Sequence, residues 1–170
     1  MIDLRQFAKP FADVTVNTFR NFVGCELMPK YPYFTDDEVD LQSDITGVIS
    51  ISGALHGVVT ISMKMEIAKK ITGKLIHAPS IDIDVDTDVV DAIGEITSII
   101  AGNAKQRIPG GDSVVISLPT VVMGQERAIV WMSHKRKILC IPFAMNGSRI
   151  FNIMVSFGVD RPDMMEYVGE

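Results

Sequence analysis

The sequence predicts an α+β fold built on a mainly antiparallel sheet. The predicted elements follow the order helix, hairpin, short helix, long helix and then four strands, so helices and strands are segregated along the chain. The segment 87–108 has the apolar period of a long helix. Asn146-Gly147, between two apolar runs, is a strong signal for a hairpin of antiparallel strands.

The segment from Ile2 to Cys25 is expected to form the first helix. Proline kinks a helix interior, so Pro10 predicts that the regular helix begins near Lys9. Gly24 is the expected stop signal. Apolar and aromatic residues recur at helical spacing and are expected to face the core: Leu4, Phe7, Phe11, Val14, Thr18 and Phe22, widened by Val16, Phe19 and Val23.

A loop, a hairpin and a short helix are expected next. The segment 28–44 holds two prolines and an acidic cluster, which predicts a loop with a short edge strand. Residues 45–64 alternate between apolar and small polar side chains with an interruption at Gly53-Ala54, which predicts two paired strands. A short helix is expected at 65–76 because three apolar residues are in helical register: Ile67, Ile71 and Leu75.

The segment Ile81–Asp88 places a carboxylate at every second residue. A calcium loop that begins at Asp84 would have its last ligand at Glu95. The sharp turn of such a loop requires glycine at its sixth position, where this sequence has the β-branched Val89. Acidic residues at a helix N-terminus also cap the helix and offset its dipole. We therefore predict that this segment caps the long helix.

The long helix expected at Thr87–Ile108 carries two stripes of residues. The apolar stripe has the spacing of a buried face and comprises Val89, Ile93, Ile96, Ile100 and Ala104, widened by Val90 and Ile99. The second stripe comprises Asp91, Glu95, Ser98 and Gly102. Residues three or four apart are neighbours on a helix surface, so this stripe presents its polar members together. Such a stripe is either a solvated face or a partner-binding surface.

Strands are expected after the long helix. Pro109-Gly110-Gly111-Asp112 breaks the helix and predicts a turn, since no Gly-Lys-Ser/Thr of a phosphate loop follows. A strand is expected at 113–123, where Pro119 marks an edge position or a bulge. The remaining elements are expected in this order: strands at 128–133, 137–145 and 152–157, and a loose tail at 161–170. Residues 1–160 are therefore expected to form one domain.

The composition narrows the class of protein. Hydrophobic residues make up 47% of the chain and the mean hydropathy is +0.25, which indicates a large core and a buried oligomer interface. The net charge of −5 argues against nucleic-acid binding. Segment 1–11 has charges where a signal peptide is apolar, and no apolar run has the length of a membrane span, so we expect a cytoplasmic protein. Cys25 and Cys140 lie far apart, which favours two free thiols over a disulfide.

The sequence lacks the signatures of common enzymes. His56, His77 and His134 do not have metal-ligand spacing, and no metal site is predicted. No Gly-x-Ser-x-Gly nucleophile elbow is present, and neither cysteine has a histidine nearby in the sequence. The expected role of His56 and His77, near a turn and at a helix end, is capping or solvation.

The segment from Asp91 to Lys105 resembles the signature helix of the CheC/CheX/FliY family of chemotaxis phosphatases and is most similar to the CheX branch. The family pattern has Asp or Ser, then Glu four residues later, then Asn three residues after that, and a Pro in a strand about twenty residues further on. Asp91, Glu95 and Pro119 match this pattern, and Ser98 stands where the family has its Asn. The Ala-Gly-Asn-Ala-Lys that ends at Lys105 is also similar to CheX.

The resemblance implies a fold and a function. The two long helices would pack together on one face of the sheet, and the protein would be a homodimer. The protein would hydrolyse the aspartyl phosphate of a CheY-type response regulator in chemotaxis signalling. The regulator would supply a lysine and Mg²⁺, so no cofactor of this protein's own is expected. Glu95 would pair with that lysine, residue 98 would hold the attacking water, and Asp91 and Gly102 would belong to the partner-binding face.

Ser98 leaves two functions open. Asn ends in a planar amide, whereas the Ser hydroxyl is one bond shorter, and misplacing a positioning group by about 1 Å costs about a hundredfold in rate. The family context favours a phosphatase with Glu95 and Ser98 as catalytic residues. The serine favours a non-catalytic binding module for a response regulator or another chemotaxis protein. Asn103 is rotated by about 140° from Ser98 around the helix, so we expect it to have a structural role.

Overall fold

The computed structural model describes residues 5–35, 43–124 and 138–158 of the chain. Their strands form one sheet in the order β1-β7-β8-β4-β3-β5, and every pairing is antiparallel. β2 also pairs with β7, and β6 also pairs with β3, so each outer edge consists of two short strands in line. The strands are β1 (Met28–Pro29), β2 (Tyr33–Thr35), β3 (Ile45–Gly53), β4 (His56–Met63), β5 (Val114–Ile116), β6 (Thr120–Met123), β7 (Ile138–Met145) and β8 (Ser148–Gly158).

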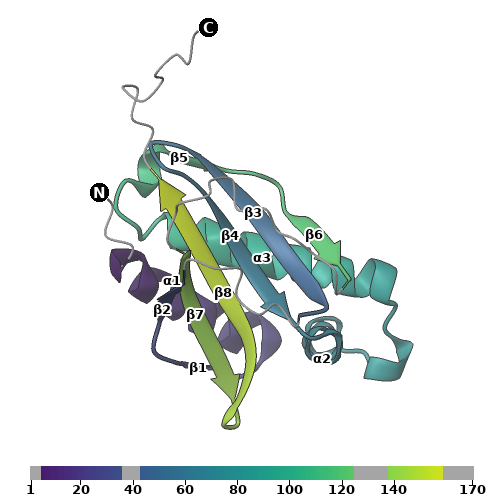
Figure 1. Ribbon diagram of the computed structural model, residues 1–170. Coiled ribbons are helices and arrows are strands. Elements are labelled where there is room, and N and C mark those ends of the chain that lie inside the picture. The colour runs from purple at the N-terminus through teal and green to yellow at the C-terminus, as the bar shows by residue number, and fades with distance from the viewer. Residues whose placement is uncertain (1–4, 36–42, 125–137, 159–170) are drawn as a thin grey trace, which may run out of the picture.

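The two long helices lie on the same face of this sheet (Figure 1). They pack against each other, and α3 also contacts β3, β4, β5 and β6. The shorter α2 lies at one end of the sheet (Figure 1). The predicted α+β fold, with a mainly antiparallel sheet and two long helices on one face, is therefore confirmed. The helical elements are α1 (Arg5–Thr18), η1 (Phe19–Val23), α2 (Met65–Ile76), η2 (Ser80–Asp82), η3 (Val85–Val89), α3 (Val90–Lys105) and η4 (Gly111–Ser113).

The core fills the space between the sheet and the two long helices. The apolar stripe of α3 is buried as predicted, since each of its five members, including Val89 at the end of η3, is at most 1% exposed. From the sheet, the ring of Phe151 stacks between those of Phe19 and Phe143, with centroids 5.0 and 5.1 Å away. A separate cluster of Ile138, Cys140 and Met154 lies on the other face of the sheet.

The first helix starts earlier than predicted. It begins at Arg5 and continues through Pro10, so the expected start near Lys9 is wrong. Proline removes one backbone hydrogen bond from a helix interior. Phe7 and Phe11 on either side of Pro10 are almost completely buried, and their packing holds the helix against the core despite the missing bond.

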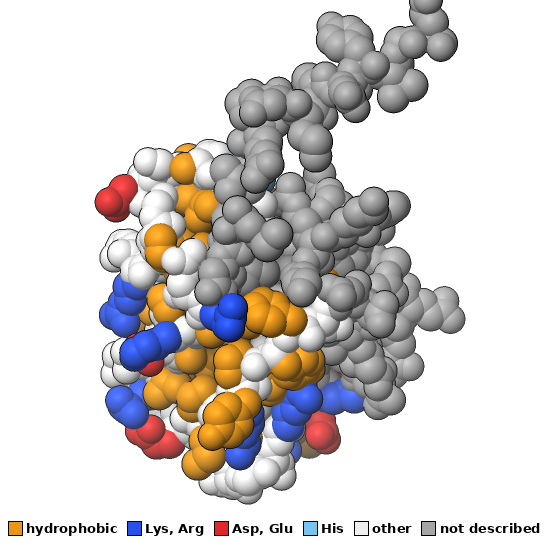
Figure 2. All heavy atoms as spheres, turned by 60° about the vertical axis from the view of Figure 1, so that its left-hand side comes forward, with side chains coloured by type: hydrophobic (Ala, Val, Ile, Leu, Met, Phe, Trp, Pro, Cys, Tyr) orange, Lys and Arg blue, Asp and Glu red, His pale blue; other side chains and the backbone are white. Residues whose placement is uncertain are grey.

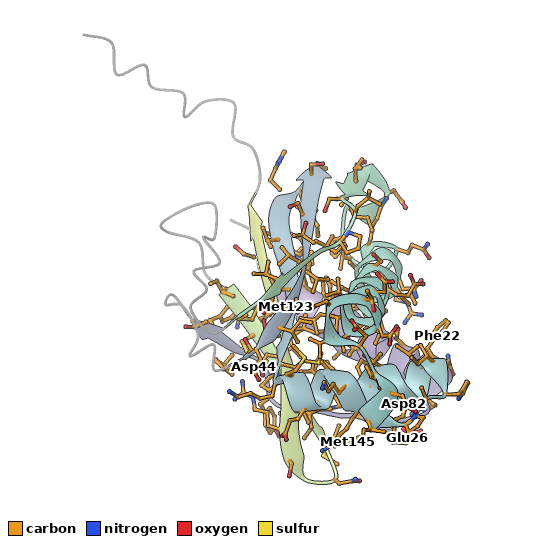
Figure 3. The ribbon with its side chains drawn as sticks, turned by 90° about the vertical axis from the view of Figure 1, so that its right-hand side faces the viewer. Phe22, Glu26, Asp44, Asp82, Met123 and Met145 are labelled. Carbon is orange, nitrogen blue, oxygen red and sulfur yellow. The ribbon has the colours of Figure 1, made fainter. Side chains whose placement is uncertain are left out.

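The end of this helix also differs from the prediction. Phe22 was expected on the buried face, but it is 54% exposed and projects outward at the edge of the molecule (Figure 3). The cause is η1, a π-helical turn, because the extra residue in a π turn shifts the buried positions to Phe19 and Val23. Gly24 ends the turn in the left-handed conformation, with φ of 70°, as expected for a stop signal.

Most strand predictions are confirmed, with changes at the proline. The β3–β4 and β7–β8 hairpins form, and the second turns at Asn146-Gly147 with φ of 51° and 82°. The described part of the segment 28–44 contains two short edge strands, where one was expected. The strand expected at 113–123 is divided into β5 and β6, because the chain breaks at Ser117-Leu118-Pro119, where proline has no N–H for the ladder.

The cysteines and the end of α2 agree with the sequence-based predictions. Cys25 and Cys140 are buried free thiols, as expected, and burial raises the pKa of the Cys140 thiol. His77 ends α2 in the left-handed conformation, as expected for a capping position. The strand expected at 128–133, His134, the tail and the domain boundary at 160 lie outside the described residues. Among the helices that the structure describes, none has the length and hydropathy to cross a bilayer.

Candidate functional site

The stripe of α3 opposite its buried face is held in place by the core. Asp91 and Glu95 are exposed, one turn apart, while the intervening Ala92, Ile93 and Gly94 are buried. Like charges at this spacing disfavour a helix, so packing of the apolar face must offset their repulsion. The two carboxylates are therefore presented to solvent from a rigid element.

The acidic segment before α3 caps η3, the π-helical turn that runs directly into α3, whereas α3 itself has no side-chain cap at Val89. Asp84 Oδ1 accepts hydrogen bonds from the Thr87 backbone N–H at 2.9 Å and from the Thr87 hydroxyl at 3.0 Å. In return, Asp88 Oδ2 accepts a bond from the Asp84 N–H at 3.0 Å. The bonds from Thr87 hold the pKa of Asp84 below its usual value. Within the described part of the chain, no three His, Cys, Asp or Glu residues gather as a metal site.

Helix α3 approaches the sheet edge closely at Gly94. A Cβ added there would lie 3.6 Å from Pro119 Cγ and 3.6 Å from Val121 Cγ2. The break between β5 and β6 is held by Ser117, whose hydroxyl accepts from the Ser50 N–H at 3.0 Å and donates to the Leu118 carbonyl at 2.7 Å. Pro119 is thus fixed against the helix, one turn of which carries both acidic residues.

An open groove of about 640 Å³ is lined by residues of α2, η3, α3, β6 and Pro119. Figure 1 shows α2 and β6 at the right of the molecule, by the N-terminal end of α3. The groove brings together Asp91, Glu95 and Pro119, the three residues of the chain that match the signature pattern. Its lining is completed by Ile76, Asp88, Val90, Ala92, Gly94 and Val121. Residues far apart in the sequence therefore form one concave surface.

The groove is acidic. Among the nine described residues that line it, three are carboxylates and none is basic. Asp88 is partly satisfied by its bond to the Asp84 N–H. Asp91 and Glu95 have neither an ion pair nor a hydrogen bond with any residue that the structure describes. An unpaired carboxylate pair in a concave surface attracts a cationic group, such as a lysine or arginine side chain of a partner.

Ser98 lies one turn further along α3 than Glu95. It is partly exposed, and its hydroxyl has no hydrogen-bond partner among residues 5–35, 43–124 and 138–158. It does not line the groove, although helical geometry places it on the same side as Asp91, Gly94 and Gly102. Its hydroxyl is thus available beside the groove rather than within it.

The other predicted members of the helix lie further away. Gly102 faces the sheet edge, since a Cβ there would be 3.8 Å from Ile116 Cδ1. Asn103 is exposed on a different side of the helix, and its structural role stays a prediction. Thr97 is completely buried and donates to the Ile93 carbonyl at 2.6 Å, so its hydroxyl is not available to a partner.

Six groove residues were not predicted as site residues from the sequence: Ile76, Asp88, Val90, Ala92, Gly94 and Val121. Gly94 offered one signal, because glycine within a strong helix often marks close approach of a neighbour. The sequence has no corresponding signal for Ile76, because its position depends on how α2 is placed in three dimensions.

Residues 45–144, more than half of the 170-residue chain, match the family model described as chemotaxis phosphatase CheX. The fold is also similar to that of a chemotaxis protein from Desulfovibrio vulgaris Hildenborough, with 29% identity, a TM-score of 0.76, and coverage of 90% of this chain and 97% of that chain. CheX from Desulfovibrio desulfuricans is 25% identical, with a TM-score of 0.74 and coverage of 91% and 99%. No curated protein matches the sequence.

A more distant structure shares the fold alone. CheX in the CheX–CheY–BeF₃–Mg²⁺ complex from Borrelia burgdorferi is 19% identical, with a TM-score of 0.73 and coverage of 92% of this chain and 99% of that chain. The family match spans β3, β4, α2, α3, β5, β6 and β7 up to Ala144, and so includes the whole groove with Asp91, Glu95 and Pro119. The chain therefore belongs to the chemotaxis phosphatase CheX family.

Proposed function

We propose that this protein binds a phosphorylated CheY-type response regulator through α3 and hydrolyses its aspartyl phosphate in cytoplasmic chemotaxis signalling. The observation that carries this proposal is the groove, in which Asp91 and Glu95 lie beside Pro119 with no partner among the residues that the structure describes. A family member from Borrelia burgdorferi forms a complex with CheY, BeF₃ and Mg²⁺, which supports a regulator of this class as the partner.

Glu95 is the docking residue in this proposal. Its carboxylate is exposed and has no competing cation among the described residues, so it can pair with a lysine of the regulator. The second carboxylate, Asp91, strengthens the negative potential around that lysine. The regulator would carry the Mg²⁺ that neutralises charge on the phosphoryl group, and this chain would supply positioning alone.

Ser98 is the water-positioning residue. It follows Glu95 by one turn, so docking of Glu95 would carry the Ser98 hydroxyl toward the phosphoryl group. The hydroxyl would accept a hydrogen bond from a water in line with the bond to be broken. Water would then attack phosphorus, the aspartyl oxygen would leave as a carboxylate, and inorganic phosphate would be released. Holding reactants in this geometry supplies much of the barrier reduction in such reactions.

A second function is favoured by the same serine. The Ser hydroxyl is shorter than the amide of the family pattern, and Ser98 does not reach into the groove. A chain that docks through Glu95 but cannot hold the water would be a binding module for a response regulator or another chemotaxis protein. Both functions use the same groove and differ only in what happens at position 98.

The resemblance also motivates a homodimer. The segment 22–34 carries five exposed large apolar side chains, namely Phe22, Met28, Tyr31, Tyr33 and Phe34. Figure 2 shows apolar side chains, mixed with Lys and Arg, on the side of the molecule that lies to the left in Figure 1. Exposed apolar surface of this kind is typical of protein–protein contacts. Light scattering on the full chain tests this, and a monomer at all concentrations would contradict it.

The function is tested by following phosphate loss from purified, phosphorylated CheY-type regulators with wild type, Glu95→Ala and Ser98→Asn. Acceleration by wild type that Glu95→Ala abolishes would establish a phosphatase in which serine suffices. An inert wild type together with an active Ser98→Asn variant would establish the binding module. If all three proteins are inert toward every regulator of the organism, hydrolysis by this site is contradicted.

A further inference from the structure

The groove is lined by apolar side chains as well as by acidic ones. Ile76 is the last residue of α2 and is 48% exposed, which is unusual for a large apolar side chain that lines a concave surface. Val90 and Val121 line the same groove from α3 and β6, and both are partly exposed. These three side chains come from three elements, and they share the groove with Asp91 and Glu95.

The position of Ile76 is fixed by the way α2 ends. The backbone N–H groups of His77 and Ala78 both bond to the Gly73 carbonyl, and His77 takes a left-handed φ of 55°. This cap stops the helix one residue after Ile76. Earlier in the same helix Ile71 is almost fully buried, whereas Ile76 lies five residues later and about 140° further around the helix, away from the core-facing side and in the lining of the groove.

We propose that Ile76, Val90 and Val121 form a subsite for an apolar side chain of the response regulator, next to the position where Asp91 and Glu95 receive its cationic side chain. The inference rests on the proposed function and deepens it. It predicts that this protein distinguishes among regulators by an apolar residue beside the lysine, because the acidic pair alone would accept any cation.

Binding by the acidic side chains of the groove and binding by its apolar side chains depend differently on salt concentration. Attraction between exposed charges is screened over about 8–10 Å at physiological ionic strength and weakens as salt is added. Burial of apolar surface does not weaken in this way, because its driving force is the release of apolar surface from water. A variant of the apolar subsite should therefore lower affinity at every salt concentration, whereas a variant of Glu95 should flatten the dependence on salt.

The structure offers a matched control for Ile76. Ile81 is also exposed, at 90%, and lies nearby in the sequence, but it does not line the groove. Ile76→Ser and Ile81→Ser remove the same side chain, and neither removes a buried core contact. Val121→Ser tests the contribution of β6 to the subsite independently, and melting curves of all variants show whether each still folds.

The experiment measures the affinity of the full chain for a purified CheY-type regulator with BeF₃⁻ and Mg²⁺, at low and high salt. We expect Ile76→Ser and Val121→Ser each to weaken binding about tenfold, which corresponds to the loss of one buried branched side chain. The affinity of both variants should depend on salt as it does in wild type. Ile81→Ser should bind like wild type. Glu95→Gln should bind more weakly and depend less on salt.

The outcomes separate this inference from the proposed function. If Glu95→Gln weakens binding while Ile76→Ser and Val121→Ser bind like wild type, the subsite is refuted and the docking role of Glu95 stands. Equal losses for Ile76→Ser and Ile81→Ser would also refute the subsite, because only one of them lies in the groove. If wild type binds no activated regulator, the proposed function itself fails, and the subsite fails with it.

Discussion

Replacing Gly47 with alanine should disrupt the packing of α3 against the sheet and destabilise the protein. Gly47 lies in β3 directly under the helix, where an added Cβ would overlap Thr97 Oγ1 and lie 3.1 Å from Thr97 Cβ and 3.3 Å from Ile93 Cγ2. Thr97 is completely buried, and its hydroxyl is held by the Ile93 carbonyl. The side chain therefore cannot rotate away without losing a buried hydrogen bond, and the helix itself must move.

The expected loss follows from two opposing terms. Overpacking a close-packed contact costs about 1–3 kcal/mol, and this overlap belongs at the upper end. Alanine gains back about 0.5–1 kcal/mol over glycine in a strand. The net loss is about 2 kcal/mol, which corresponds to a fall in melting temperature of about 4–8 °C for a chain of this size. Thermal unfolding followed by circular dichroism measures the change.

Two further variants make this prediction specific. Thr97→Ala removes the overlapping hydroxyl, so Gly47→Ala should cost about 1 kcal/mol less in that background than in wild type. Gly94→Ala is the matched glycine control, because its Cβ would lie at an ordinary 3.6 Å from Pro119 and it should leave stability unchanged or raise it by up to about 1 kcal/mol. An equal loss for Gly47→Ala in both backgrounds would refute the proposed contact.

Two other predictions concern the ends of the long helices. Phe19→Ala should destabilise the protein by about 3–5 kcal/mol, whereas Phe22→Ala should change stability by less than about 0.5 kcal/mol. Urea unfolding measures both changes, and similar losses for the two variants would mean that the π turn does not determine which residues are buried. Asp84→Ala should lower the melting temperature at neutral pH. Because the folded-state pKa of Asp84 is depressed, its contribution is complete above the unfolded pKa of about 4 and is lost as the pH falls through the folded value. A difference between wild type and Asp84→Ala that persists unchanged in strong acid would argue against the cap.

The buried half of α3 could be predicted from the sequence because helix periodicity records burial directly. Val89, Ile93 and Ile100 recur at helical spacing, and all three are buried. The same reasoning failed at Phe22, since a π turn changes the period within one turn and leaves no signal in residue type. The β5–β6 break was indicated by Pro119, but proline alone does not distinguish a bulge from a division into two strands.

Residue spacing predicted the site only where it follows one helix, and Pro119 was predicted by the family resemblance instead. Asp91 and Glu95 are neighbours because four residues make about one helical turn, so their spacing in the sequence predicts that they are close. The groove also needs Ile76 from α2 and Val121 from β6, which are brought together by tertiary packing. The spacing of residues along the chain does not predict contacts between distant elements, so the apolar side chains of the groove could be identified only from the folded structure.

Recognition of an activated regulator by the α3 stripe is tested most directly by one binding measurement. The full chain is titrated with a CheY-type regulator and Mg²⁺, with and without BeF₃⁻, as wild type, Glu95→Gln and Glu66→Gln. Glu66 is an exposed acid at the other end of α2 from the groove and serves as the matched control. We expect binding that requires BeF₃⁻, is weakened in Glu95→Gln and is retained in full in Glu66→Gln. Binding that is independent of BeF₃⁻, or unchanged in Glu95→Gln, would show that the groove on α3 does not recognise the phosphorylated form of the regulator.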